Sequence, residues 1–215
     1  MDSMALIEHY FPDLTPGQRQ QMEALGPFYA TWNARINLIS RRDMGHFYER
    51  HVLHSLGIAQ VGKLVEPAHV LDVGTGGGFP GIPLAILYPQ CHFHLVDSIQ
   101  KKVRVVEEVV AALGLENVTV AHQRAEKVKG PFSFVVSRAV TQMPRFLAWI
   151  RGVWEPEVRA GKRPGGLLAL KGGDLSAELR GISHELFDLS DYYQEPFFET
   201  KKVVYVSGAA PRQTR

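Results

Sequence analysis

A glycine-rich stretch at residues 71–89, LDVGTGGGFPGIPLAILYP, constrains this chain more than any other feature. An apolar run precedes the glycines and a helix-like segment follows them. Residues without a Cβ permit tight turns and let the backbone approach a ligand closely. The stretch therefore predicts a strand, a ligand-binding turn and a helix, the alternative being a purely structural turn.

Two ligand patterns overlap in this stretch. Gly76-x-Gly78-x-x-Gly81 matches the dinucleotide fingerprint, and Asp72-x-Gly74-x-Gly76-x-Gly78 matches the pattern of S-adenosylmethionine (AdoMet) methyltransferases. Asp72 favours the second pattern, because a carboxylate attracts the ammonium and sulfonium of AdoMet but repels an anionic pyrophosphate. We therefore expect AdoMet contacts at Asp72, Gly74, Gly76 and Gly78.

Short apolar or β-branched runs alternate with helix-like segments over most of the chain. The predicted strands are residues 69–73, 92–96, 118–122, 132–136, 166–170 and 202–206. Helices are expected at 81–88 and 98–113, with Gly114 as a C-cap. This alternation predicts a doubly wound, mostly parallel α/β sheet of the Rossmann-like type. A seventh strand at 187–193 would pair with the last one as an antiparallel C-terminal hairpin.

The first 65 residues have a helical pattern. Thr15 is a potential N-cap, followed by Pro16 at the first helical position, and Gly26-Pro27 predicts a kink or a break into two helices. A further helix is expected after Asp43. We therefore divide the chain into a helical extension (1–65), a methyltransferase domain (66–207) and a flexible tail (208–215).

Composition excludes several classes of protein. The chain has 215 residues, 45% of them hydrophobic and 21% charged, which is ordinary for a globular protein. A net charge of +2 does not indicate a nucleic-acid binder, and the basic pairs Arg41-Arg42, Lys101-Lys102, Lys162-Arg163 and Lys201-Lys202 are typical of solvated surface. No signal peptide or membrane span is recognisable, so a cytoplasmic protein without membrane contact is expected.

The cysteine and histidine content indicates that no metal is bound. A single cysteine, Cys91, excludes an internal disulfide and a cysteine-cluster zinc site. The nine histidines lack ligand spacing. We expect Cys91 to be a buried structural thiol before the second strand.

Two further positions are expected to bind the adenosine of the ligand. Asp97 ends the second strand, where its two oxygens can accept from both ribose hydroxyls. The loop Gln123-Arg124-Ala125-Glu126 follows the third strand and would lie beside the adenine. For this loop, an exposed charge pair without a ligand is the alternative.

The residues after the fourth strand, Ser137-Arg138-Ala139-Val140, are where an AdoMet enzyme usually handles its acceptor. The sequence has no Asn/Asp-Pro-Pro-aromatic element there, and Cys91 lies at the other end of the sheet. An acceptor with an available lone pair, such as guanine N7, needs no general base, so orientation suffices. Arg138 is the candidate for orientation, the alternative being an ion pair under the fold.

Several longer motifs are spread over nearly the whole chain: WNARINLIS (32–40), RHVLHSL (50–56), LDVGTGGGFPGIPLAI (71–86), LVDSIQKKVR (95–104), RAE (124–126), VVSRA (135–139) and LLALKGG (167–173). In these motifs the chain resembles the RsmG family of small-subunit ribosomal RNA guanine-N7 methyltransferases. The resemblance implies a Rossmann-like methyltransferase domain with a helical N-terminal part that acts on 16S rRNA.

The resemblance also implies roles for individual residues. The AdoMet contacts that it implies are Gly74, Phe79, Asp97, Ser98, Ala125, Glu126 and Arg138. Its RNA-side candidates are Asn37, Arg50, His51 and Lys171. A structural role is the alternative for each RNA-side residue.

These observations lead to one main hypothesis and two alternatives. The main hypothesis is a monomeric enzyme that transfers a methyl group from AdoMet to N7 of a guanosine in 16S rRNA of the small ribosomal subunit. The first alternative is a small-molecule methyltransferase with the helical part as a lid. The second is a non-catalytic nucleotide-binding module or an NAD-dependent oxidoreductase, against which the sequence lacks a Ser-Tyr-Lys or His-Asp arrangement.

Overall fold

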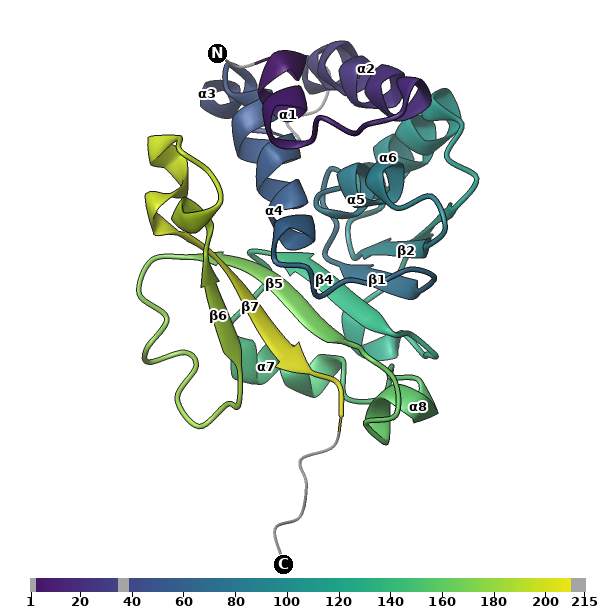
Figure 1. Cartoon of the computed structure of the whole chain (residues 1–215). Helices are drawn as coiled ribbons and strands as arrows, with labels where there is room; N and C mark the ends of the chain where they lie inside the picture. The colour runs from purple at the N-terminus through teal and green to yellow at the C-terminus, as the bar shows by residue number, and fades with distance from the viewer. Residues whose placement is uncertain (1–2, 35–38, 210–215) are drawn as a thin grey trace, which may run out of the picture.

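A seven-stranded sheet runs through the molecule, and helices cover both of its faces (Figure 1). The computed structural model describes residues 3–34 and 39–209. The strands are β1 (His69–Val73), β2 (His92–Asp97), β3 (Val118–His122), β4 (Phe134–Arg138), β5 (Gly166–Gly172), β6 (Glu185–Asp188) and β7 (Lys201–Ser207). Their order is β3-β2-β1-β4-β5-β7-β6. The predicted doubly wound α/β fold is confirmed.

The first five strands pair in parallel, and β7 runs antiparallel to both β5 and β6. The predicted C-terminal hairpin is therefore present, but the bounds predicted for its first strand were wrong. That strand ends at Asp188, because Leu189–Asp191 form a 3-10 turn that buries Leu189 and Tyr193. A second 3-10 segment, Pro196–Thr200, leads into β7.

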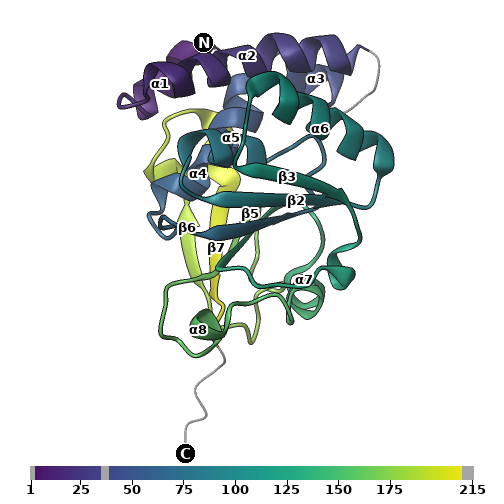
Figure 2. The same cartoon turned by 90° about the vertical axis from the view of Figure 1, so that its right-hand side faces the viewer.

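Helices on one face come mainly from the first half of the chain, as the two views show (Figures 1 and 2). They are α1 (Met4–Tyr10), α2 (Pro16–Asn33), α3 (Arg41–Met44), the π-helical segment Tyr48–Leu53, α4 (His54–Gln60), α5 (Gly81–Leu87) and α6 (Gln100–Leu113). The other face carries α7 (Met143–Trp149), and α8 (Pro156–Arg159) lies beside the start of β5. Gly114 caps α6 in the left-handed conformation, as predicted.

Helix α2 begins at the predicted cap and continues through Gly26-Pro27, so of the predicted kink or break the break was wrong, while the kink stays a prediction. Thr15 and Gln18 form a capping box. Pro27 has no N–H to donate to the carbonyl of Glu23, and the hydroxyl of Tyr48 donates to that carbonyl instead, at 2.9 Å. The missing Cβ of Gly26 makes room for the same tyrosine, since a Cβ there would lie 2.8 Å from its hydroxyl oxygen.

The N-terminal helices share a hydrophobic core with the sheet. One buried cluster contains Met22 and Tyr29 of α2 together with Val70 of β1 and Phe93 of β2. A second cluster joins the opposite face of the sheet to α7. The division at residue 65 stays a prediction, and residues 210–215 of the expected tail lie outside the described residues. No helix of the described residues is long and apolar enough to cross a membrane.

Candidate active site

The carboxyl ends of β1, β2, β3 and β4 surround a cavity of about 600 Å³. Such ends are where ligands bind in sheets of this kind. The predicted site residues that line it are Gly74, Gly76, Phe79, Asp97, Ser98, Ala125, Glu126 and Arg138. The fold therefore brings together predicted residues from four separate loops. Asp72 and Gly78 do not line the cavity.

Asp72 is fully buried beneath the glycine loop. Its Oδ2 accepts hydrogen bonds from the Thr75 hydroxyl at 2.7 Å and from the Gly81 N–H at 2.9 Å. Burial raises the pKa of Asp72 to about 7, against the opposing effect of these bonds and of the nearby Arg138. Asp72 thus joins the start of the loop to the start of α5. Because it does not line the cavity, Asp72 can affect a ligand only by holding this loop or through its charge.

Gly78 is required for packing against neighbouring helices. Its φ is 91°, and a Cβ there would lie 2.4 Å from Cδ1 of Ile82 and 3.0 Å from the hydroxyl of Tyr29. That hydroxyl donates to the carbonyl of Gly77. Since Tyr29 belongs to α2, the helical extension directly holds the glycine loop.

Asp97 fastens the loops after β1 and β2 to each other. Its Oδ2 accepts from the Gly76 N–H at 2.9 Å, and its Oδ1 accepts from the Ile99 N–H at 2.8 Å. A carboxylate oxygen can accept two hydrogen bonds, so each of these oxygens keeps capacity for one more donor. The neighbouring Ile99 lines the cavity with 47% of its surface exposed, which provides an apolar surface for a flat ring.

The loop after β3 forms a 3-10 turn, Ala125–Lys127, at the rim of the cavity. Glu126 lies 3.9 Å from Arg124, and both side chains are largely exposed. The loop thus borders the cavity as predicted and also carries the exposed charge pair that was the alternative.

Arg138, at the end of β4, joins the cavity to the helical extension. Its Nη1 donates to the carbonyl of Arg50 at 3.3 Å, and its Nη2 lies 3.1 Å from Nδ1 of His51. Its guanidinium lies 5.1 Å from the ring centre of Phe79. We call Arg50, His51, Phe79 and Arg138 the Arg138 cluster.

The charges in the Arg138 cluster are set by burial. Burial lowers the pKa of Arg138 to about 10, so it remains a cation at pH 7. Burial, and then the charge of Arg138, lower the pKa of His51 to about 3, so this ring is neutral and its Nδ1 accepts from Arg138. No carboxylate among residues 3–34 and 39–209 forms an ion pair with Arg138. The direct partners of this cation among the described residues are therefore neutral.

The three RNA-side candidates that the structure describes, Arg50, His51 and Lys171, lie outside the cavity lining. Asn37 falls outside the described residues. Arg50 pairs with Asp43 at 2.8 Å, and His51 contacts Arg138. Lys171, on β5, donates to a main-chain carbonyl at 2.6 Å and pairs with a glutamate. Two of the three described candidates thus belong to the Arg138 cluster.

Lys171 supports the loop after β4. The carbonyl to which it donates is that of Thr141 in this loop. Its partner glutamate, Glu178, lies 2.6 Å from Nζ and also accepts from the Met143 N–H at 2.7 Å. The same loop contains Ala139, which lines the cavity and has φ of 52°, a conformation that costs a non-glycine residue about 1 kcal/mol or more. The Lys171–Glu178 pair helps to hold this loop in place.

Several residues that line the cavity were missed by sequence reasoning: Thr75, Gly77, Ile99, Lys102, Arg145 and Trp149. Arg145 and Trp149 lie on α7, where the guanidinium of Arg145 is 5.1 Å from the ring centre of Trp149. Pro144 in the first turn, with Met143 and Phe146 three residues apart, is the local signal that could have indicated this helix.

Comparison with known proteins identifies the family. A family model described as "GidB: rRNA small subunit methyltransferase G" matches residues 18–200. The chain belongs to this family. It is 52% identical over 205 residues to a protein from Christiangramia forsetii, covering 95% of this chain and 97% of that one. It is 53% identical over 204 residues to a protein from Bacteroides thetaiotaomicron, covering 94% and 98%. Both relatives carry the name "Ribosomal RNA small subunit methyltransferase G".

Solved structures agree on the fold. A SAM-dependent methyltransferase from Aquifex aeolicus has a TM-score of 0.56 and 20% identity, covering 74% of this chain and 90% of its own. A mutant of MtNAS in complex with S-adenosylmethionine has a TM-score of 0.58 and 13% identity, covering 95% and 77%. The Rossmann-like methyltransferase fold and the resemblance to the RsmG family are confirmed.

Cys91 lies where the sequence predicted. It is fully buried just before β2, at the amino end of the sheet, and burial raises the pKa of its thiol to about 11. A thiol in that state is a poor nucleophile. Among the described side chains, no group of three or more His, Cys, Asp or Glu residues is placed to hold a metal ion.

Proposed function

We propose that this protein transfers a methyl group from AdoMet to N7 of a guanosine in 16S rRNA of the small ribosomal subunit. The observation that carries the proposal is the cavity in which Asp97 braces the glycine loop and keeps hydrogen-bonding capacity, in a chain of the rRNA methyltransferase G family. We further propose that it acts as a monomer in the cytoplasm, where its ribosomal substrate is made.

The residues of the cavity fit the proposed donor. The free capacity of the Asp97 carboxylate suits two ribose hydroxyls, and the exposed face of Ile99 suits an adenine. Gly74 and Gly76, at φ of 69° and 60°, bring main chain to the cavity wall without side chains in the way. AdoMet bound there supplies a methyl group carried on a sulfonium.

The acceptor side fits a nucleophile that needs no base. Guanine N7 has a free lone pair, so no residue must remove a proton before transfer. His51 is neutral, and its Nδ1 already accepts from Arg138. Arg138 can donate to guanine O6, which would set the orientation of N7. The chain therefore acts by orienting the base and excluding water.

Binding and transfer experiments test the two parts separately. Calorimetry should show AdoMet binding and no comparable NAD binding, and tight binding of NAD alone would reject the donor assignment. Labelled AdoMet should then transfer methyl to small subunits from cells that lack this protein. Label found only in free metabolites would favour the small-molecule alternative and reject the RNA substrate.

A further inference from the structure

The segment Pro196–Thr200 places an aromatic ring beside the Arg138 cluster. The ring of Phe197 is half-buried, with the guanidinium carbon of Arg50 at 5.6 Å from its centre and Nζ of Lys201 at 4.7 Å. The imidazole of His54 packs edge-on against the same ring at 5.4 Å. Two cations from distant parts of the chain thus converge on one phenylalanine.

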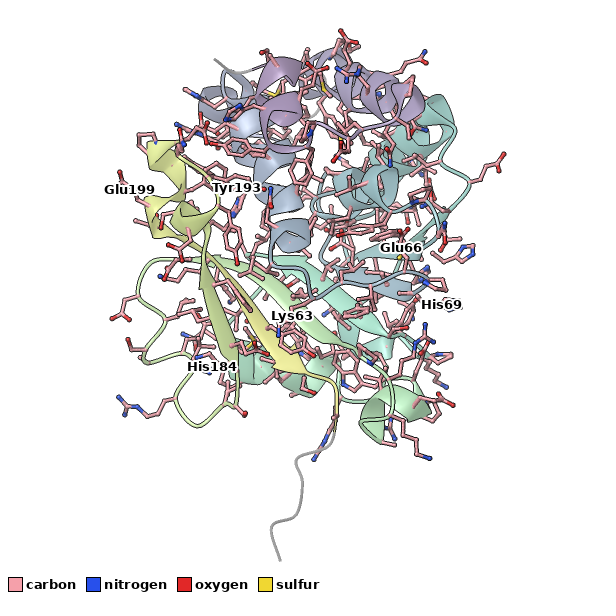
Figure 3. The ribbon with its side chains drawn as sticks, viewed as in Figure 1. Lys63, Glu66, His69, His184, Tyr193 and Glu199 are labelled. Atoms are coloured by element: carbon pink, nitrogen blue, oxygen red, sulfur yellow. The ribbon has the colours of Figure 1, made fainter. Side chains whose placement is uncertain are left out.

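No carboxylate of the described residues forms an ion pair with Lys201. In the part of the chain that the structure describes, its one side-chain hydrogen bond is a long one of 3.5 Å to Thr200. Glu199, a nearby carboxylate in sequence, is exposed and lies at the outer edge of the segment (Figure 3). The position of Lys201 therefore leaves it available to an external anion.

Two further cations near this lysine, Arg50 and Arg138, have a single carboxylate partner between them among the described residues. Within the part of the chain that the structure describes, Arg50 has one carboxylate partner, Asp43, and its buried Nε has no hydrogen-bond partner. Arg138 has no carboxylate partner among the described residues. The buried His54 stays neutral, because burial and the charges of Arg138 and Lys201 lower its pKa. The attraction of each cation to the aromatic ring offsets only part of the electrostatic repulsion between the cations. A bound anion would therefore stabilise this arrangement further.

The strand register places these cations at the edge of the sheet where the cavity opens. Lys201 pairs with Gly172 at the carboxyl end of β5, and Arg138 lies at the carboxyl end of β4. Arg50 joins them through its carbonyl, which accepts from Arg138. An anion bound by Lys201 and Arg50 would therefore lie next to the acceptor side of the cavity and outside it.

We infer that Lys201 and Arg50, held by Phe197, bind a backbone phosphate of the rRNA strand next to the target guanosine. This inference rests on the proposed function. A base that is turned into a pocket leaves its flanking phosphates on the protein surface, and such contacts fix the position of the strand without reading its sequence. The carboxylate of AdoMet is the competing anion, which the experiment below separates from a phosphate.

The test compares Lys201→Met with Lys202→Met in full-length protein. Lys202 is the matched control, because side chains alternate along a strand and Lys202 bonds Asp188 across the hairpin. Methyl transfer to small subunits is measured over a range of salt concentrations, and AdoMet affinity is measured by calorimetry. Lys201→Met should raise KM for the subunit about tenfold, as expected for one lost charge-assisted bond.

The salt dependence identifies the anion. Lys201→Met should reduce the slope of log KM against log salt by about 1, while kcat and the Kd for AdoMet stay at wild-type values. Lys202→Met should match wild type, and Lys201→Arg should retain most of the affinity for the subunit. Phe197→Leu, which keeps apolar packing but removes the ring, should raise KM by a smaller factor.

Two results would overturn the inference while leaving the proposed function intact. One is an active Lys201→Met variant with wild-type KM and salt slope. The other is a variant whose only change is weaker AdoMet binding, which would assign the lysine to the donor. If wild-type protein transfers no methyl to RNA, the proposed function fails, and this inference fails with it.

Discussion

The glycine loop and the Arg138 cluster lie on two sides of one cavity but are built differently. The glycine loop presents mainly backbone to the cavity. Hydrogen bonds to the carboxylates of Asp97 and Asp72 and from the hydroxyl of Tyr29 hold this backbone in place. The Arg138 cluster consists of side chains, and its members Arg50 and Arg138 are 88 residues apart. Most single side-chain substitutions, other than those of Asp97, Asp72 and Tyr29, should therefore leave the loop in place. In the Arg138 cluster, by contrast, each substitution removes one of the contacts that form it.

The largest expected effect is at the residue that connects the two regions. Arg138→Ala should lower kcat/KM for the small subunit at least 100-fold, about 3 kcal/mol, because the cluster loses its bonds to the π-helical segment and the contact with Phe79. Arg138→Lys should recover little, since an ammonium lacks the planar fork. A folded Arg138→Ala variant with activity within about threefold of wild type would remove the cluster from the reaction.

The second prediction separates AdoMet binding, at the glycine loop, from binding of the small subunit, at the Arg138 cluster. Asp97→Ala should weaken AdoMet binding by about 1.5–3 kcal/mol, because the loop loses its fastener and the ligand loses an ionised acceptor. KM for the subunit should change little. Asp174→Ala is the control, as Asp174 is exposed and bonds only Ser176 among the described residues. Calorimetry that gave equal AdoMet affinities for the two variants would contradict the role of Asp97.

The third effect concerns stability against pH on the cluster side. His51 has a folded pKa of about 3 against an ordinary value of 6.5, so the unfolded chain binds the proton first as pH falls. The stability contributed by the neutral ring is therefore present above about pH 6.5 and is lost toward pH 3.

His51→Gln isolates this contribution. Between pH 7 and pH 5, the free energy of unfolding should fall by about 1–2 kcal/mol more in wild type than in the variant. Asp72, whose raised pKa acts in the opposite direction, is present in both proteins and cancels in the comparison. Denaturant titrations at the two pH values measure the difference, and identical losses would mean that His51 is protonated in the folded state.

The smallest effect tests the support of the loop by the helical extension. Tyr29→Phe removes the hydroxyl that donates to the carbonyl of Gly77 and should weaken AdoMet binding by about 0.5–1.5 kcal/mol. Tyr205→Phe is a matched control, because that hydroxyl also donates to a glycine carbonyl, Gly165, away from the cavity. If both variants bind AdoMet like wild type, α2 does not support the ligand site.

The same difference between the regions explains what the sequence could predict. Gly76 and Asp97 belong to consecutive strand ends, so alternating strands and helices suffice to bring them together. The strand pattern likewise predicted six strands nearly to their ends. A local strand pattern predicts which residues meet at the site, because parallel strands place their carboxyl ends at one edge of the sheet.

Other features depended on contacts between distant segments. Pro27 predicted a kink or a break, but the helix continues, and the Tyr48 hydroxyl replaces the missing donor. Phe197 and Lys201 gave no local signal of function, because their proposed role depends on the contact of Phe197 with Arg50, which is distant in sequence. Each of these outcomes was decided by a tertiary contact that no short pattern contains. Asp72 is a different case: it was expected at the ligand, but its carboxylate accepts from Thr75 and Gly81 within the same glycine-rich stretch.

The most direct test of the account is identification of the methylated nucleoside. Small subunits from cells lacking this protein are incubated with AdoMet and either wild type or Asp97→Ala, and their 16S rRNA is digested and analysed by mass spectrometry. We expect 7-methylguanosine at a single position with wild type and a strongly reduced amount with the variant. Methylation at a carbon or an exocyclic nitrogen, or none in the RNA, would contradict this expectation.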